Sequence, residues 1–184
     1  AIIAVSLFGQ PANFSKINKI AKKKNITVIE DGAQSFGSTH KTKKSCNLSS
    51  IGCTSFFPTK TLGGFGDGGA CFTNDNKLAK KIFQIRSHGQ FKKYNYKLIG
   101  INGRLDTIQA GIIIEKLNLF KKELELRNKV AKNYNKLIKK FKKKINIPYI
   151  NPLNKSAYAQ YSILLKNREK TIKNFIKKKI PYAI

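Results

Sequence analysis

Two short apolar runs separated by an amphipathic segment are the feature that most constrains the fold of this chain. The first run, IIAVSLFG, covers residues 2–9, and the second, ITVIEDG, covers residues 26–32. The segment between them places apolar side chains on one helical stripe, namely Phe14, Ile17, Ile20 and Ala21. A strand, a helix and a second, parallel strand in this order form a βαβ unit. We therefore predict an α/β fold, in which ligands bind at the carboxyl ends of the parallel strands.

The following part of the sequence continues the alternation of strands and helices. Residues 52–60 and 68–74 are expected to form short strands on either side of a glycine-rich loop. Residues 75–89 predict a helix with Asp75 as its N-cap and Gly89 as its stop.

Two further helices are predicted after a loop that is rich in lysine, tyrosine and asparagine. The first, residues 104–120, is so rich in isoleucine that we expect burial on most of its sides. The second, residues 121–143, is amphipathic. Its inward-facing residues are expected to be Leu124, Val130, Ala131, Tyr134, Leu137 and Ile138.

A strand at residues 158–167 and a helix at residues 168–179 are predicted near the end of the chain. We place part of a large domain in residues 1–120, and a connecting helix with the start of a small α+β domain in residues 121–184. Because the opening residues already have the character of an interior strand, we expect the chain to be part of a longer protein.

The charge of the chain suggests two classes of partner. It has 37 lysine and arginine residues against nine acids, a formal net charge of +28, which suits nucleic acid or an anionic membrane surface. Only four of the basic residues are arginine, however, and nucleic-acid binders favour arginine interleaved with aromatic side chains. The lysine runs at 22–24, 139–144 and 177–179 fall where helices would expose a face, so we expect neither partner. A basic module that binds RNA or lipid without catalysis is the rival interpretation.

The apolar runs and the cysteine pattern indicate a reduced, cytoplasmic protein. No run approaches the roughly 18 apolar residues that are needed to cross a bilayer. Cys46, Cys53 and Cys71 form neither a CxxC pair nor a cluster with zinc spacing, so we expect free thiols and no metal. His40 and His88 are interpreted as structural.

One lysine is isolated in a chain that is otherwise crowded with lysine. Lys60 lies in SFFPTKTLGGFGDGG, residues 55–69, and no other lysine occurs between Ser45 and Asn76. A lysine amine becomes a nucleophile when desolvation or a nearby cation lowers its pKa from about 10. The aromatic and glycine neighbours of Lys60 favour a lysine that traps a carbonyl group, such as that of pyridoxal phosphate. The alternative is a loop lysine whose ammonium group reaches solvent.

Pyridoxal phosphate also needs an acidic side chain beside its pyridine nitrogen. A carboxylate keeps that nitrogen protonated, which lets the ring withdraw electrons from the substrate carbon. Glu30 and Asp31 stand at the carboxyl end of the second predicted strand, and of the two we choose Asp31. The alternative is that Asp31 is an N-cap or an acid at the edge of the core.

Three segments resemble, in order and spacing, the DegT/DnrJ/EryC1/StrS family of sugar aminotransferases: VIEDGAQSFGS, TSFFPTKTLGGFGDGGACFTND and GINGRLDTIQA. The resemblance implies a fold-type-I, aspartate-aminotransferase-like large domain, pyridoxal 5'-phosphate as cofactor, and a homodimer with shared active sites. It also implies amino transfer from glutamate, which becomes 2-oxoglutarate, to a UDP-linked keto sugar for surface polysaccharide such as O-antigen. Other segments, such as YAQYSILLKNRE, are similar to family members that act on UDP-2-acetamido-2-deoxy-3-oxo-glucuronate. A 4-keto-6-deoxy sugar is the alternative substrate.

The resemblance also implies a role for each matched residue. Lys60 would be the Schiff-base lysine that carries a proton between the substrate carbon and the cofactor, and Asp31 would pair with the pyridinium. Gln34 would contact the phenolic oxygen of the cofactor, and Ser55 would donate a hydrogen bond to its phosphate. The alternatives are that Gln34 is an ordinary turn residue and Ser55 an ordinary strand residue.

Two residues of the segment GINGRLD receive roles in the same way. Asn102 would reach across the dimer interface to the phosphate in the partner's site. Arg104 would lie near the substrate, where its guanidinium suits a carboxylate. An ordinary loop residue and a surface cation are the alternatives. The glycine-rich loop completes no nucleotide-binding motif, so we interpret its glycines as permitting tight turns beside Lys60, with Asp67 fixing the loop.

Overall fold

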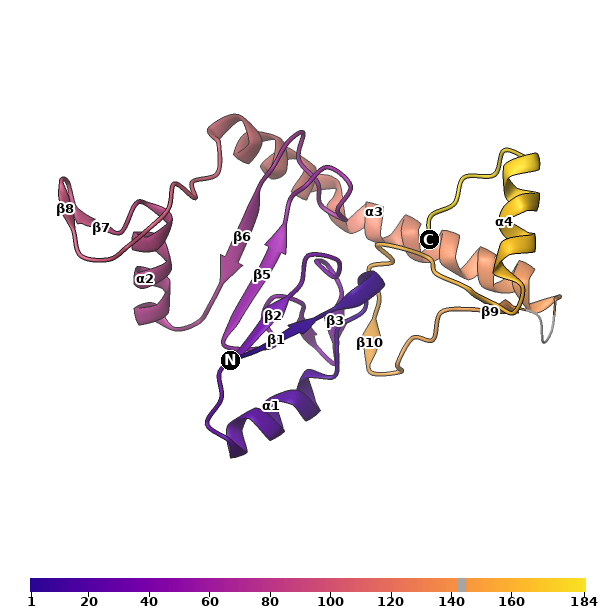
Figure 1. Cartoon of the computed structure of the whole chain (residues 1–184), viewed down its shortest axis with the longest axis horizontal. Coiled ribbons are helices and arrows are strands. Elements are labelled where there is room, and N and C mark those ends of the chain that lie inside the picture. Colours follow the sequence, from indigo (N-terminus) through magenta and orange to yellow (C-terminus); the bar gives the residue numbers. More distant parts are fainter. Residues whose placement is uncertain (142–144) are drawn as a thin grey trace.

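The computed structural model describes residues 1–141 and 145–184 of the chain. Its centre is a four-stranded sheet in the order β1-β2-β5-β6, in which the first three strands run parallel and β6 runs antiparallel to β5 (Figure 1). The bounds of these strands are Ile2–Val5 for β1, Val28–Asp31 for β2, Ile51–Ser55 for β5 and Gly69–Phe72 for β6. The predicted α/β class and the parallel pair at the start of the chain are confirmed.

Helix α1 (Phe14–Lys23) connects β1 to β2 and covers one face of the sheet. It begins where the side chain of Asn13 accepts a hydrogen bond of 3.1 Å from the Lys16 N–H. The first core cluster forms beneath it from Ala4, Phe14, Ala21, Val28 and Leu48. The first predicted strand is shorter than expected, because Phe8 and Gly9 adopt left-handed φ angles of 58° and 100° and end the extended chain.

The helix predicted at residues 75–89 is observed as α2 (Asn76–Arg86), and both its predicted N-cap, Asp75, and its predicted stop, Gly89, are confirmed. Asp75 accepts hydrogen bonds from the N–H groups of Lys77 and Leu78, as an N-cap does. Gly89 has a φ of +75° and its N–H donates to the Gln84 carbonyl, so the chain reverses there.

Helix α3 (Thr107–Lys139) is a single helix of 33 residues, so the prediction of two separate helices was wrong. The expected break rested on a change from apolar to charged composition, and such a change does not interrupt backbone hydrogen bonds. No proline occurs within α3, and open space surrounds its one glycine, Gly111. The expected domain boundary after residue 120 lies inside this helix and stays a prediction.

The expected burial of α3 was also wrong in part. Ile108 and Ile114 are 73% and 60% exposed, because α3 packs against the rest of the described chain along a single stripe. The buried or partly buried side chains on that stripe are Ile113, Phe120, Leu124, Ala131 and Ile138. The predicted inward residues Val130, Tyr134 and Leu137 are at least half exposed, although the ring of Tyr134 stacks on that of Tyr161 with centroids 5.1 Å apart.

Several short elements complete the described fold. Three strands make a small second sheet in the order β10-β3-β4, and two antiparallel pairs join β7 with β8 and β9 with β11. The predicted strand at residues 158–167 is reduced to the two residues of β11, and the predicted helix after it is confirmed as α4. The bounds are Thr39–His40 (β3), Lys43–Lys44 (β4), Gln90–Lys92 (β7), Asn95–Tyr96 (β8), Ile145–Asn146 (β9), Asn154–Lys155 (β10), Leu164–Leu165 (β11) and Arg168–Lys177 (α4).

His40 is structural, as predicted. Its ring lies between the hydroxyl of Ser15 at 2.8 Å and the side-chain oxygen of Asn154 at 2.6 Å, so it ties α1 to β10. The lysine runs at 22–24 and 177–179 are exposed, as expected, whereas part of the run at 139–144 lies outside the described residues. None of the helices in the described ranges combines the length and the apolar character needed to cross a membrane.

Candidate functional site

The loops that follow β1, β2 and β5 meet at the carboxyl edge of the parallel strands. The Ser6 N–H donates to the Asp31 carbonyl at 3.0 Å, and the Gly32 N–H donates to the Cys53 carbonyl at 2.7 Å. The side-chain oxygen of Gln34 accepts a hydrogen bond of 2.8 Å from the Phe8 N–H. The loops that carry Asp31, Gln34, Ser55 and Lys60 therefore start from one edge, where α/β folds bind ligands.

The two acids at the end of β2 have different environments. The Glu30 side chain is fully buried and accepts hydrogen bonds from the Ser45 hydroxyl at 2.7 Å and the Leu48 N–H at 3.2 Å. Asp31 is partly exposed, and one of its oxygens accepts a hydrogen bond of 3.0 Å from the Ala33 N–H. Both carboxylate oxygens of Glu30 therefore accept hydrogen bonds inside the protein. Asp31 has one carboxylate oxygen that accepts no hydrogen bond from the described residues and can contact a group at the edge of the sheet.

Gln34 can both position the loops and donate a hydrogen bond. Its oxygen is occupied by Phe8, whereas its NH₂ group donates to no acceptor among the described residues. The side chain is partly buried and lies in the turn that follows β2. An amide in this state offers two neutral donors to an oxygen atom of a bound molecule.

Ser55 and Lys60 bracket the start of the loop that follows β5. The Ser55 oxygen accepts a hydrogen bond of 3.2 Å from the Phe57 N–H, which leaves its own O–H available as a donor. The Lys60 N–H donates to the Phe57 carbonyl at 2.9 Å and fixes the turn around Pro58. Lys60 is partly buried, and its Nζ makes no hydrogen bond or ion pair with the described residues.

The loop of Lys60 is held from outside by Gln109 of α3, a residue that sequence reasoning missed. The Gln109 side-chain oxygen accepts a hydrogen bond of 2.9 Å from the Phe65 N–H, and the Thr61 hydroxyl donates to the Phe36 carbonyl at 3.1 Å. Asp67, which we had expected to fix the loop, is exposed and makes no side-chain hydrogen bond within the described chain. No local signal marks Gln109, because its partner is 44 residues away.

Gly63 in the loop and Gly69 at the start of β6 are required for space and not, as interpreted from the sequence, for turn conformation. Neither of them has a left-handed φ, since among glycines such angles occur only at Gly9, Gly37 and Gly89. A Cβ atom on Gly63 would lie 2.4 Å from the Pro58 carbonyl oxygen, and one on Gly69 would lie 2.7 Å from the Thr54 carbonyl oxygen. A larger residue at either position would push the backbone apart.

No hydrogen bond among the described residues links Asn102 or Arg104 to the carboxyl edge of the parallel strands. Asn102 forms an isolated bridge with Ser87, and the Gly103 N–H donates to the Arg86 carbonyl at 2.8 Å. Both Asn102 and Arg104 are exposed on the segment that leads into α3. Their predicted roles, in the partner's site and beside the substrate, stay predictions.

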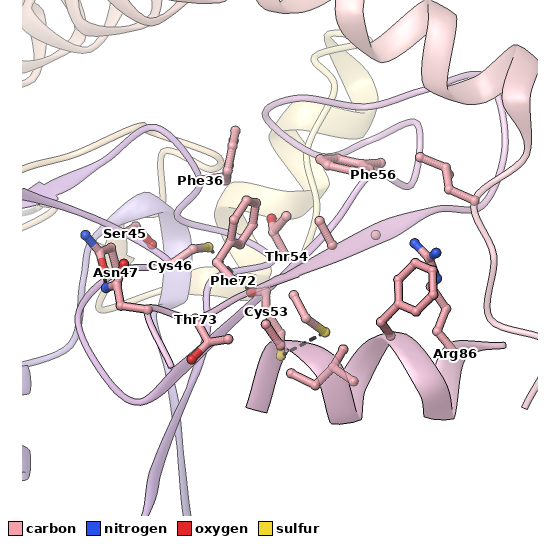
Figure 2. Close-up of a pocket in the computed structure, with 18 of the residues that line it drawn as sticks. Phe36, Ser45, Cys46, Asn47, Cys53, Thr54, Phe56, Phe72, Thr73 and Arg86 are labelled. Carbon is pink, nitrogen blue, oxygen red and sulfur yellow. Dashed lines mark hydrogen bonds between the residues drawn. The ribbon is translucent and has the colours of Figure 1, made fainter. Parts of the chain in front are cut away.

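A cavity of about 1400 Å³ extends from residues 42–47 over the β5–β6 hairpin to α2 (Figure 2). Its lining is mainly aromatic and aliphatic, with Cys53 and Cys71 in its wall and Arg86 at the side of α2. None of the six predicted site residues lines it. No sequence pattern indicates this cavity, because its walls come from segments that are distant in the chain.

The sequence model of the DegT/DnrJ/EryC1/StrS aminotransferase family matches residues 1–183 of the chain. The UDP-2-acetamido-2-deoxy-3-oxo-D-glucuronate aminotransferase of Pseudomonas aeruginosa is 50% identical over 184 residues, which are 100% of this chain and 51% of that protein. The chain thus spans about half the length of this relative.

Two solved structures have closely similar folds. A DegT DnrJ EryC1 StrS aminotransferase from Brucella abortus matches with a TM-score of 0.95 and 40% identity, over 100% of this chain and 49% of that one. DesV of S. venezuelae, solved in complex with a ketimine intermediate, matches with a TM-score of 0.88 and 27% identity, over 96% of this chain and 47% of that one.

Proposed function

This chain belongs to the DegT/DnrJ/EryC1/StrS aminotransferase family, and from that premise we propose that the full-length protein transfers an amino group to a nucleotide-linked keto sugar. Pyridoxal phosphate is the cofactor that the family implies. The observation that carries the proposal is that a partly exposed carboxylate, Asp31, ends β2, while a partly buried lysine, Lys60, lies in the loop that leaves β5 at the same edge of the sheet.

The residues at the edge fit such a cofactor. A carboxylate, an amine, a hydroxyl donor and an amide donor match its ring nitrogen, carbonyl carbon, phosphate and phenolic oxygen in chemical type. When bound, pyridoxal phosphate supplies an electrophilic carbonyl and a ring that withdraws electrons from the substrate carbon. The buried network of Glu30 with Ser45 and Leu48 anchors the end of β2, on which Asp31 stands.

Each residue then has a defined task. Asp31, held by the Ala33 N–H, would place a negative charge beside the pyridine nitrogen and favour its protonated form. Lys60 would hold and return the proton of the substrate carbon at its Nζ. Ser55 would donate its O–H to the phosphate, and Gln34 would donate its NH₂ to the phenolic oxygen.

For the substrate we propose a UDP-linked 3-keto sugar that carries a carboxylate, because the Pseudomonas aeruginosa relative, which matches over the whole chain, is named for one. Glutamate is the proposed amino donor and surface polysaccharide the proposed use of the product. Arg104 is the proposed partner of the sugar carboxylate, and Asn102 the proposed phosphate contact in the partner subunit's site. A 4-keto-6-deoxy sugar is the alternative substrate within the same family.

The proposal is tested with the full-length protein, pyridoxal phosphate, glutamate and UDP-2-acetamido-2-deoxy-3-oxo-glucuronate. We expect equal amounts of 2-oxoglutarate and of a sugar that has exchanged its keto oxygen for an amino group, measured by mass spectrometry. Borohydride reduction should attach the cofactor to the peptide that contains Lys60, and the variant Lys60→Ala should form no product. Attachment at another lysine would overturn the assignment, and absence of amino sugar with every keto sugar supplied would overturn the function.

A further inference from the structure

Cys53 of β5 and Cys71 of β6 face each other across the hairpin that carries the Lys60 loop. The two residues are register partners, and their Sγ atoms lie 3.8 Å apart. The dashed line in Figure 2 joins these two sulfur atoms in the wall of the cavity beside α2. The expectation of free thiols rested on the absence of a CxxC pair and of zinc spacing, and neither pattern reveals two cysteines that a hairpin brings together over 18 residues.

The hydrogen-bond pattern of the hairpin favours a bond between the two sulfurs. The Phe56 N–H donates to the Gly68 carbonyl, so this pair is hydrogen-bonded, and hydrogen-bonded pairs alternate with non-hydrogen-bonded ones along antiparallel strands. Counting along the register makes Cys53 and Cys71 a non-hydrogen-bonded pair, whose Cα atoms are about 4.5 Å apart in such ladders. Disulfides span Cα separations of about 4.4 to 6.8 Å. The backbone is therefore already within disulfide range.

We propose that Cys53 and Cys71 form a reversible dithiol–disulfide pair, which hydrogen peroxide or another hydroperoxide oxidises and which clamps the β5–β6 hairpin at the base of the Lys60 loop. The pair would be a modification site distinct from the residues of the proposed transamination. The proposal does not depend on that function, since it uses only the geometry of the hairpin.

The exposures of the two thiols assign them different parts in the reaction. Within the described chain Cys71 is the more exposed of the two thiols, so we assign its thiolate as the sulfur that attacks the peroxide. The O–O bond breaks, Cys71 becomes a sulfenic acid, and the leaving hydroxide takes a proton to become water. The Cys53 sulfur then attacks the Cys71 sulfur, the S–O bond breaks, and the second oxygen leaves as water with the Cys53 proton. Two thiols and one hydroperoxide thus give one disulfide, with water and the reduced peroxide fragment.

Cys53 is less suited than Cys71 to the first step. Burial, and then the neighbouring Cys71, raise the pKa of the Cys53 thiol to about 11, so it is protonated at neutral pH. Cys46 is an unsuitable partner, because it is buried and its thiol donates to the Cys53 carbonyl at 3.6 Å. The pair Cys53–Cys71 is therefore the expected disulfide among the three cysteines of the chain.

A disulfide at this place would restrain the two strands from which the Lys60 loop departs. Ser55 is two residues after Cys53, and Gly69 is two residues before Cys71. Cys53 is also the register partner of Asp31 in the neighbouring parallel strand. The clamp therefore lies beside the carboxyl edge and closes a loop, which reduces the conformational freedom of the unfolded chain.

The test uses the reduced full-length protein, treated with a small excess of hydrogen peroxide, alkylated and digested. We expect one linked product that contains Cys53 and Cys71, a loss of about two mass units for the two hydrogens removed, and recovery of both thiols with dithiothreitol. The midpoint of thermal unfolding should rise by several degrees on oxidation and return on reduction.

Two variants make the result specific. Cys71→Ser should abolish both the linked peptide and the rise in the unfolding midpoint, whereas Cys46→Ser should leave both intact. Far-ultraviolet circular dichroism checks that each variant is folded. The proposal is overturned if Cys71 proceeds to a sulfinic acid with Cys53 unmodified, if Cys46 enters the bond, if the link joins two chains, or if neither thiol reacts.

Discussion

The side-chain oxygen of Gln34 accepts a hydrogen bond of 2.8 Å from the backbone N–H of Phe8, so one side chain joins the loops after β1 and β2. Phe8 has a left-handed φ of 58°, an unfavourable conformation for a residue with a side chain. Gln34 thus holds a strained turn in place at the edge that carries the proposed site.

Two substitutions separate the positioning role of Gln34 from its proposed role as a donor. Gln34→Ala removes the acceptor and should destabilise the full-length protein by about 1 kcal/mol, as measured by urea unfolding. Gln34→Glu keeps an oxygen for Phe8 but loses the NH₂ donor, so it should retain more of the stability while turnover falls. If the two variants lose equal stability, the carboxylate oxygen of the Gln34→Glu variant does not replace the amide oxygen as acceptor of the hydrogen bond from the Phe8 N–H.

Replacement of Asp31 by asparagine should leave cofactor binding largely intact and remove most turnover. Asparagine keeps an oxygen for the Ala33 N–H but carries no charge, so the pyridine nitrogen would no longer be held protonated. The measurements are a cofactor titration and kcat on the full-length protein. Asp67→Asn, an exposed change in the neighbouring loop, is the matched control. Normal turnover in Asp31→Asn would make Asp31 a structural residue.

The proposed role of Asn102 in the partner subunit's site predicts that mixed dimers of two variants regain activity. Lys60→Ala and Asn102→Ala chains should each be inactive or weak, whereas mixed dimers regain one site with both residues. Random exchange of subunits should then restore about a quarter of the wild-type activity. If subunit exchange is shown by differently tagged chains and no activity returns, Asn102 does not act in the partner subunit's site.

Arg104 should decide the preference for a sugar carboxylate. A charge-assisted pair contributes about 1.5 to 3 kcal/mol, so Arg104→Ala should lower kcat/KM for the carboxylate sugar about ten- to a hundredfold. The value for a sugar with a methyl group in place of the carboxylate should change little. Arg168→Ala, an exposed arginine of α4, serves as the control. A wild-type preference for the methyl sugar would instead support the 4-keto-6-deoxy alternative.

Burial should make the alkylation of Cys53 strongly dependent on pH. Its pKa of about 11 lies above the ordinary thiol value of 9.0, so in the reduced native protein labelling by iodoacetamide should rise about tenfold per pH unit until about pH 11. Because the folded state binds the proton more tightly, this thiol destabilises the fold as the pH rises from about 9 to about 11. Labelling that levels off near pH 9 would show that burial does not raise the pKa.

The sequence by itself determined the local elements and the chemical inventory of this protein. The strands and helices of the βαβ start and of the strand–loop–strand around Lys60 follow from periodicity, and the cap at Asp75 depends on hydrogen bonds that span only two or three residues. The isolation of Lys60 and the acids at the end of β2 are also visible in the sequence alone. Local patterns therefore sufficed for the fold class and singled out Lys60 and Asp31 as candidates, whereas Gln34, Ser55, Asn102 and Arg104 were chosen from the family resemblance.

Only the tertiary structure decided which side chains stand next to each other. Strand register aligns Val5, Asp31, Cys53 and Cys71 in one row across four strands, although these residues span 66 positions of the chain. The hydrogen bond from Phe65 to Gln109 and the contacts along one stripe of α3 likewise join residues that are far apart in the chain. Pairing between distant strands and packing of distant faces depend on the whole chain at once, so no short segment of sequence contains them.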